Sequence, residues 1–401
     1  MPGIYIHIPF CKQACHYCNF HFSTSLGQKE KMLQAIAKEI TSAQPRPPLF
    51  STKGEEIPKN ESEIKAKLDR EIISTLYFGG GTPSILSIDD LKIIFEALHK
   101  RFVFAADIEI TLEANPDDIN ALKLKEWQGL GINRLSVGIQ SFLEPELIWM
   151  NRAHTATESI TCIDLIKEAG FTNFSVDLIY GSPILSDADW KRNVDIVIEK
   201  NITHISCYAL TVEPKTALDK MIALHKKEPV DAEKQARQFL LLMDWMEEAG
   251  YEHYEISNFA KTGLRSKHNS SYWSHTAAGL GESYYAFGPA AHAFDGKSRR
   301  WNIANNALYI QSLQKNIIPF DEEILTKTQQ LNEYIMTSLR TMEGLDLDYV
   351  SKVFGEDKSS KIKVAGSRYE STGKLKAVNN KLILTREGKL FADGIAADLF
   401  F

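Results

Sequence analysis

The sequence has few cysteines, no long apolar run and no basic patch. Its 401 residues include five cysteines, an odd number with three crowded into eight positions, which excludes a secreted disulfide framework. No stretch approaches the roughly 20 apolar residues of a membrane span, and no basic segment with an apolar core opens the chain. The net charge of -6, without a Lys/Arg-rich patch, gives no support for nucleic-acid binding. These absences predict a cytoplasmic protein in a reducing compartment.

Three of the cysteines, Cys11, Cys15 and Cys18, form a C-x3-C-x2-C motif directly after a strand-like run at 4–8. A [4Fe–4S] cluster takes four ligands, so three cysteines leave one iron open for a small molecule. Reactive metal sites keep such a position open, whereas structural sites close it. The residues alone leave two alternatives, which are free structural thiols or a zinc site completed by His7, His16 or His21.

Short apolar runs alternate with amphipathic segments from the N-terminus to about residue 260. The predicted strands are 4–8, 74–80, 108–114, 134–141, 174–181 and 204–210. The predicted helices include 29–40, 89–102, 156–170, 187–200 and 231–250. Repeated strand-then-helix units indicate a parallel sheet with right-handed crossovers, which is either an open α/β sheet or a barrel.

Polar side chains on the strands favour the barrel. Successive side chains of a strand point to opposite faces, and three neighbouring strands are polar on one face and apolar on the other. A flat sheet covered by helices would be apolar on both faces, whereas the inner face of a barrel can be polar where it builds a site. We therefore predict a partial (β/α)6 TIM-like barrel whose polar face contains Glu109, Thr111, Glu113, Ser136, Gly138, Gln140, Ser175 and Asp177.

The rest of the chain divides into two further parts. Segment 43–68 is rich in proline and charge, which predicts an exposed insertion before the second strand. Segment 251–260 is predicted as one more strand. We assign residues 1–300 to the barrel and residues 301–401 to a small helical domain that resembles a winged helix but has no basic recognition helix.

The run YFGGGTPS ends the second predicted strand and holds Gly79, Gly80, Gly81 and Thr82. Glycines let backbone N–H groups approach a ligand, so this run can bind a carboxylate or an amino group, although a tight turn is an equal alternative. Glu113, at a strand end, is placed to accept both hydroxyls of a ribose. Arg152 can pair with a carboxylate, and structural salt bridging is the alternative for Arg152 and for Asp177.

These motifs resemble the radical S-adenosylmethionine (SAM) superfamily, and more specifically the oxygen-independent coproporphyrinogen III oxidase (HemN-like) family. The resemblance rests on YIHIPFC, the cysteine motif, GGGTPS, LEANPDD, LSVGIQSF, NRAH, VDLIYGSP and the winged C-terminal segment. It implies a radical SAM barrel in which Cys11, Cys15 and Cys18 bind a [4Fe–4S] cluster whose open iron chelates SAM. By the same resemblance, SAM or a second ligand would be surrounded by Tyr5, Tyr17, Gly80, Gly81, Thr82, Glu113, Gln140, Arg152, Asp177 and Ala209.

Two departures select a branch of the family. By this resemblance, the oxidases have the motif C-x3-C-x2-C-x-C and carry an N-terminal extension. This chain has Phe20 where that motif has its fourth cysteine, and only ten residues before Cys11. The run HNSSYW resembles the motif of the heme chaperone branch, which implies heme as a third cofactor beside His268, Tyr272 and Trp273. A structural histidine with two core aromatics is the alternative that the hexapeptide alone favours.

The expected function is therefore that of a radical SAM protein that binds heme or a porphyrin and delivers it to acceptor hemoproteins, some of them at the membrane surface, with an electron donor for its cluster. Coproporphyrinogen III oxidation is the alternative, and an unrelated radical SAM substrate is a third. No catalytic residue is assigned, and whether SAM is cleaved in turnover stays open.

Overall fold

Six parallel strands form the centre of the molecule, and their order in the sheet is their order in the chain. The computed structural model describes residues 2–43, 70–273 and 283–401, so the predicted insertion lies outside the described residues except for residue 43. The strands are β1 (Gly3–Ile8), β2 (Glu71–Gly80), β3 (Phe102–Ala114), β4 (Arg134–Gln140), β5 (Phe174–Tyr180) and β6 (His204–Ala209). Within the described part of the chain, β6 pairs with β5 and β8 and does not close onto β1, so the barrel is partial, as predicted.

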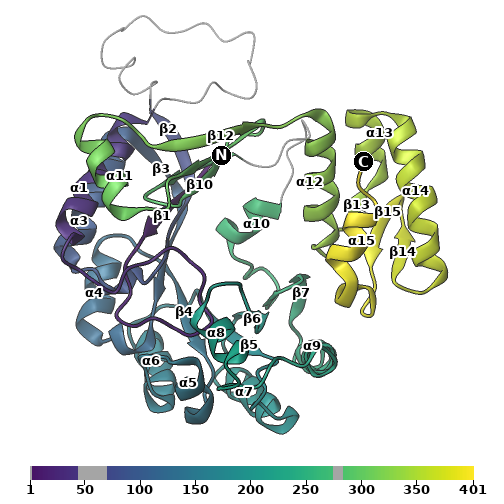
Figure 1. Cartoon of the computed structure of the whole chain (residues 1–401), viewed down its shortest axis with the longest axis horizontal. Helices are drawn as coiled ribbons and strands as arrows, with labels where there is room; N and C mark the ends of the chain where they lie inside the picture. Colours follow the sequence, from purple (N-terminus) through teal and green to yellow (C-terminus); the bar gives the residue numbers. More distant parts are fainter. Residues whose placement is uncertain (1, 44–69, 274–282) are drawn as a thin grey trace, which may run out of the picture.

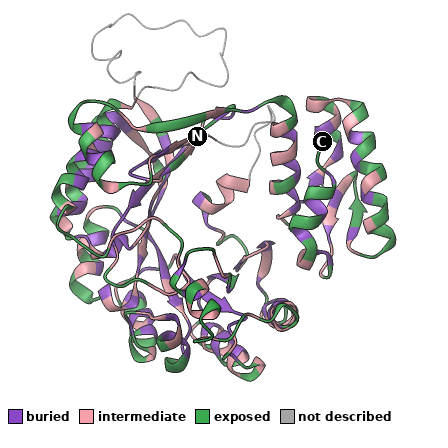
Figure 2. Cartoon of the chain, in the orientation of Figure 1, coloured by how far each residue is buried: buried purple, intermediate pink, exposed green. Residues whose placement is uncertain are grey.

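Helices surround these strands, and most of them cover the outer face of the sheet (Figure 1). They are α1 (Lys29–Ser42), α3 (Ile88–Arg101), α4 (Ala121–Gly129), α5 (Glu144–Met150), α6 (Ala156–Glu168), α7 (Asp187–Glu199), α8 (Ala217–Ala223) and α9 (Ala232–Glu248). Helix α8 instead lies beside the loop that carries the three motif cysteines (Figure 1). Capping boxes begin two of them, with Ser87 at α3 and Thr155 at α6. Figure 2 shows that the buried residues follow the strands and the inner faces of these helices. Most of these residues form one core, and those of α5 and α8 form a smaller one with Ile179 and Leu210.

The sheet extends beyond the barrel strands at both edges. Beside β1 lie β9 (Tyr284–Phe287), β10 (His292–Phe294), β11 (Ser298–Asn302) and β12 (Phe320–Ile324), and α11 (Asn306–Gln314) joins the last two. Beside β6 lie β8 (Asn258–Ala260) and β7 (Glu252–Glu255). The single strand predicted over 251–260 is wrong, because the chain reverses after Glu255 and pairs β7 antiparallel with β8.

The C-terminal domain has its own core and lies to one side of the sheet (Figure 1). It contains α12 (Lys327–Leu339), β13 (Leu345–Asp346), α13 (Leu347–Phe354), α14 (Glu356–Ser371), β14 (Leu375–Val378), β15 (Lys381–Leu384) and α15 (Ala392–Asp398). The three strands form a small antiparallel sheet, which agrees with the expected winged-helix-like architecture. The large sheet continues to Ile324, so we place the domain boundary near residue 325 rather than at 301.

Backbone hydrogen bonds fix this domain against the barrel. The N–H of Ile256 donates to the carbonyl of Arg340 at 3.0 Å, and the N–H of Met342 donates to the carbonyl of Tyr254 at 3.1 Å. The Arg340 side chain also pairs with the buried carboxylate of Glu255 at 3.3 Å. Between the two domains lies the short helix α10 (Lys267–Trp273) (Figure 1). No described helix is long and apolar enough to cross a membrane.

Candidate functional site

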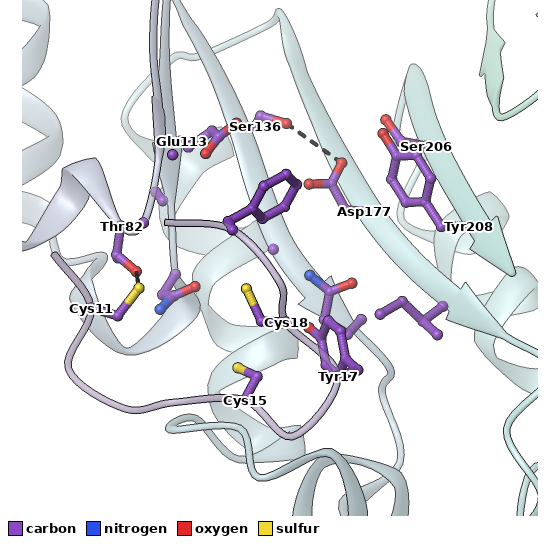
Figure 3. Close-up of a pocket in the computed structure, with 18 of the residues that line it drawn as sticks. Cys11, Cys15, Tyr17, Cys18, Thr82, Glu113, Ser136, Asp177, Ser206 and Tyr208 are labelled. Atoms are coloured by element: carbon purple, nitrogen blue, oxygen red, sulfur yellow. Dashed lines mark hydrogen bonds between the residues drawn. The ribbon is translucent and has the colours of Figure 1, made fainter. Parts of the chain in front are cut away.

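A cavity of about 430 Å³ opens at the carboxyl ends of the parallel strands, on the inner face of the sheet. The loop between β1 and α1 forms one side of it and carries the three motif cysteines, while polar side chains of β3 to β6 form the other (Figure 3). Among the residues that line it are Cys11, Cys15, Tyr17, Cys18, Gly80, Gly81, Thr82, Glu113, Gln140, Arg152, Asp177 and Ala209. The structure thus gathers around one cavity every residue predicted for the cluster and SAM except Tyr5.

Contacts with two other segments hold the cysteine loop in place. The ammonium of Lys12 lies 2.7 Å from a carboxylate oxygen of Asp117 and 2.5 Å from one of Asp118, at the end of β3. Asn151, which follows α5 in the left-handed conformation, donates through Nδ2 to the carbonyl of Ala14 at 2.8 Å. The N–H of His16 donates to the carbonyl of Met150 at 3.0 Å. The loop conformation therefore depends on the strand ends of the barrel as well as on its own sequence.

The donor set of this loop fits an iron–sulfur cluster better than a zinc ion. All three cysteines are free thiols that face the cavity, and Thr82 donates to the sulfur of Cys11 at 3.4 Å (Figure 3). No three Cys, His, Asp or Glu side chains in the described residues converge as ligands of a single metal ion. A cluster instead takes each thiolate on a different iron, so its ligands need not converge.

The nearby histidines have other partners. His7 Nε2 bonds to the carbonyl of His21 at 2.9 Å, and His16 Nδ1 lies 3.0 Å from the carbonyl of Trp149. His21 Nε2 bonds to Asn306 Oδ1 at 2.8 Å. Each of the three histidines considered as a zinc ligand therefore has a ring nitrogen engaged away from the cysteines.

The glycine run serves close packing as well as the cavity. A Cβ on Gly81 would lie 2.5 Å from the carbonyl oxygen of Phe10, and the Gly81 N–H donates to the carbonyl of Ile8 at 2.8 Å. Gly80 has a φ of +107°, which favours glycine, and a Cβ there would lie 2.7 Å from the His7 ring. The prediction that the Gly81 N–H is available to a ligand is therefore wrong, because this group already bonds to β1.

Two acidic side chains of the polar face stand on β3 and β5, the strands on either side of β4. The Tyr77 hydroxyl donates to Glu113 Oε1 at 2.8 Å, and burial raises the pKa of Glu113 to about 8. Burial likewise raises the pKa of Asp177 to about 6, against hydrogen bonds from Ser206 and Ser136 that lower it. Both carboxyl groups can therefore accept hydrogen bonds from a polar ligand such as a ribose.

Arg152 connects the cysteine loop to β4. Its Nη2 donates to Asn115 Oδ1 at 2.8 Å and to the carbonyl of Gly138 at 2.7 Å, while Nη1 lies 3.2 Å from the sulfur of Cys15. The described structure gives Arg152 no carboxylate partner in an ion pair, so its charge faces the thiols of the cavity. A hydrogen bond to a cluster sulfur is one of the features that set the reduction potential of a cluster.

Gln140 occupies a strained position beside this arginine. Its φ is +66° at the end of β4, where the pairing with β5 shifts its register. Such conformations in residues other than glycine cost free energy and cluster at functional sites. Tyr5, which does not line the cavity, stacks on Tyr77 with ring centroids 6.1 Å apart.

The three residues predicted to bind heme lie beside the cavity, although Asn269 of the same segment lines it. His268 is 2% exposed, with Nδ1 bonded to Thr75 Oγ1 at 2.8 Å and Nε2 bonded to the Tyr272 hydroxyl at 3.0 Å. The indole N–H of Trp273 is buried and has no hydrogen-bond partner among the described residues, and Arg340 lies 5.5 Å from the Trp273 ring centroid. Both ring nitrogens of His268 are thus engaged inside the protein, where burial lowers its pKa to about 3.

Several residues that line the cavity were not predicted from the sequence, although for some of them the sequence contains a pattern that could have identified them. His204, Ser206 and Tyr208 alternate along β6 and line the cavity, so the period of two that identified the polar faces of β3 to β5 also applies here. Phe20 also lines it and is 67% exposed. Asn115, which accepts from Arg152, follows β3 and lies in the LEANPDD run, a motif of the family resemblance, but no role was predicted for this residue.

Comparisons with known families agree with this geometry. Residues 5–197 match the model of the radical SAM superfamily, and residues 325–391 match the model of the HemN C-terminal domain. The superfamily implies a [4Fe–4S] cluster and SAM, for which the cysteine loop and the polar strand ends supply suitable groups. The HemN C-terminal match begins where the second core of the structure begins.

Individual relatives resemble the whole chain. The heme chaperone HemW of Bacillus subtilis (strain 168) is 30% identical over 98% of both chains, and HemW of Mycobacterium tuberculosis (strain ATCC 25618 / H37Rv) is 29% identical over 99% of this chain and 94% of its own. The solved structure of coproporphyrinogen III oxidase (HemN) from Escherichia coli has a TM-score of 0.80 at 20% identity and covers 100% of this chain and 90% of its own, which shows the same fold. The chain therefore belongs to the radical SAM superfamily and, within its HemN-like proteins, to the HemW family.

Proposed function

We propose that this protein is a heme chaperone, which uses a [4Fe–4S] cluster and SAM, binds heme and delivers it to acceptor hemoproteins in or facing the cytoplasm. The observation that carries this proposal is the 30% identity to the Bacillus subtilis heme chaperone HemW, which extends over 98% of both chains. Such coverage includes the cysteine loop, the polar strand ends and the C-terminal domain together, so the proposal rests on the whole architecture and not on one motif.

The cavity mouth supports this choice over the oxidase. The motif of the oxidase branch has a further cysteine at the position that Phe20 occupies in this chain. The side chain of Phe20 is 67% exposed. Tyr208 lines the same cavity and is 44% exposed. Exposed aromatic rings at a cavity mouth suit contact with a flat apolar ring such as a porphyrin.

His268, Tyr272 and Trp273 remain our proposed heme contacts. A neutral imidazole is a common axial ligand of heme iron, and burial keeps His268 neutral. Ligation through Nε2 requires that the bond to the Tyr272 hydroxyl breaks, so heme binding involves a rearrangement of α10. The protein further needs an electron donor for its cluster and an acceptor hemoprotein, some acceptors lying at the membrane surface.

The test is anaerobic reconstitution of the cluster, followed by parallel assays for heme binding and for coproporphyrinogen consumption. We expect a saturable shift of the Soret band on titration with hemin, which His268→Ala weakens. His292→Ala is the matched control, because His292 also stacks on an aromatic ring, Trp301, but lies on β10 away from the cavity. Conversion of coproporphyrinogen to protoporphyrinogen without saturable hemin binding would show that the protein is an oxidase and would refute the chaperone function.

A further inference from the structure

The heme-motif histidine contacts a side chain of the candidate SAM site, Tyr77. The rings of His268 and Tyr77 stack with centroids 4.9 Å apart and planes 19° apart. The hydroxyl of Tyr77 donates to Glu113 Oε1 at 2.8 Å. The ring of Tyr77 thus contacts His268 of the heme motif, and its hydroxyl oxygen contacts Glu113, the proposed acceptor of the ribose hydroxyls.

The surroundings leave Tyr77 little freedom. The Tyr5 ring stacks on it at 6.1 Å, and a Cβ on Gly79 would lie 2.9 Å from atoms of Tyr5, Tyr77 and Glu113 alike. Burial, followed by the charge of Glu113, raises the pKa of Tyr77 well above its usual value, so its hydroxyl keeps the proton that it donates. The direction in which the phenol points therefore depends on the rings that hold it.

His268 is itself fixed from several sides. Its N–H donates to Glu109 Oε1 at 2.9 Å, and its ring nitrogens bond to Thr75 and Tyr272. A Cβ on Gly3 would lie 3.4 Å from His268 Nδ1, which shows how closely β1 approaches the ring. The imidazole of His268 is thus held in one position, and the ring of Tyr77 packs against it.

We propose that the SAM site and the heme motif are coupled through Tyr77, which positions Glu113 while His268 positions Tyr77. The part that concerns heme rests on the proposed function. Binding of a heme iron to Nε2 of His268 would move the imidazole away from the Tyr77 ring. Tyr77 would then no longer hold the carboxyl group of Glu113, which accepts the ribose hydroxyls, in one position. Coupling free energies are reciprocal, so bound SAM must weaken heme binding by the same factor.

The first test measures SAM affinity by equilibrium dialysis with the reconstituted, heme-free protein. Tyr77→Phe keeps the ring and removes only the donor, and we expect the dissociation constant for SAM to rise about tenfold, which is near the upper end of what one intramolecular hydrogen bond contributes. His268→Ala should raise it about threefold, within the range for aromatic pairs, whereas His268→Phe, which keeps a flat ring, should not. His292→Ala serves again as the control.

A double-mutant cycle separates positioning from general damage. If Tyr77 acts through Glu113, Tyr77→Phe should cost nothing further in a Glu113→Gln background. An unchanged SAM dissociation constant in Tyr77→Phe, or a cost that persists undiminished beside Glu113→Gln, would overturn the proposal. Because Tyr77→Phe removes one oxygen and no packing, this arm survives if His268→Ala fails to fold.

The second test titrates hemin into the reconstituted protein with and without saturating SAM. We expect SAM to weaken hemin binding severalfold in the unaltered protein and not in Tyr77→Phe. Equal hemin affinity with and without SAM in the unaltered protein would refute the coupling. Absence of any saturable hemin binding would refute the proposed function instead, while the dialysis cycle still decides whether Tyr77 and His268 position Glu113.

Discussion

Replacing Gly81 by alanine should disturb the cysteine loop more than the fold. The added Cβ would lie 2.5 Å from the carbonyl oxygen of Phe10, 2.8 Å from its nitrogen and 2.9 Å from the carbonyl oxygen of Ile8. All three are backbone atoms, and Phe10 directly precedes Cys11, so relief requires a shift of the segment that begins the cluster loop. Overpacking of this kind costs about 1–3 kcal/mol.

The assay is the iron and sulfide content per chain after anaerobic reconstitution, together with urea-induced unfolding of the apoprotein. We expect Gly81→Ala to take up markedly less cluster while it still unfolds cooperatively. Gly129→Ala is the matched control, because a Cβ there meets no atom within 4 Å and adds up to about 1 kcal/mol of helix stability. Full cluster content and unchanged stability in Gly81→Ala would show that the loop does not depend on this approach.

Three further outcomes follow from the contacts described. Cys15→Ala should abolish the visible absorption of the cluster, whereas Cys207→Ala, buried on β6, should leave it intact; stoichiometric zinc in anaerobically purified protein would contradict this. Burial raises the pKa of Glu113 from 4.5 to about 8, so between these pH values the folded apoprotein holds a proton that the unfolded chain releases. The free energy of unfolding should therefore fall as the pH rises from 4.5 to about 8, and Glu113→Gln should flatten that part of the pH profile. Arg340→Ala, which leaves the carboxylate of Glu255 without its cation between the domains, should destabilise the protein by about 1–3 kcal/mol, whereas Arg368→Ala at an exposed pair should cost less than about 1 kcal/mol in the same urea titration.

The sequence allowed the barrel to be predicted because its pattern is local. Each β/α unit carries its own alternation, and the polar face that includes Ser136 and Asp177 follows from a period of two. The strands β9 to β12 were not predicted, since their place beside β1 depends on pairing over a long sequence separation. The hairpin of β7 and β8 was missed because the turn at Ile256 and Ser257 contains no glycine or proline.

The same distinction holds for the site. Motif spacing identified the cysteine loop, and the cavity collects most of the residues predicted around it. Spacing could not reveal that the N–H of Gly81 is already bonded to Ile8, or that both nitrogens of His268 have partners inside the protein. Such facts depend on which side chains meet from distant parts of the chain, as Thr75 meets His268, and no window of sequence contains both.

The position of β1 in the middle of the large sheet has a consequence for biosynthesis. Its neighbours are β2 and β9, with Gly3 opposite Thr75 on one side and Tyr284 on the other. A ribosome adding about 5–20 residues per second needs roughly 10–40 s to make the roughly 210 residues between Thr75 and Tyr284. During that interval the nascent chain carries the three thiols on the loop that follows β1, and β1 still lacks one of its two neighbours. The cysteine loop therefore stays beside an incomplete sheet until translation is nearly three-quarters complete, so insertion of a cluster into the fully formed site must follow the synthesis of β9.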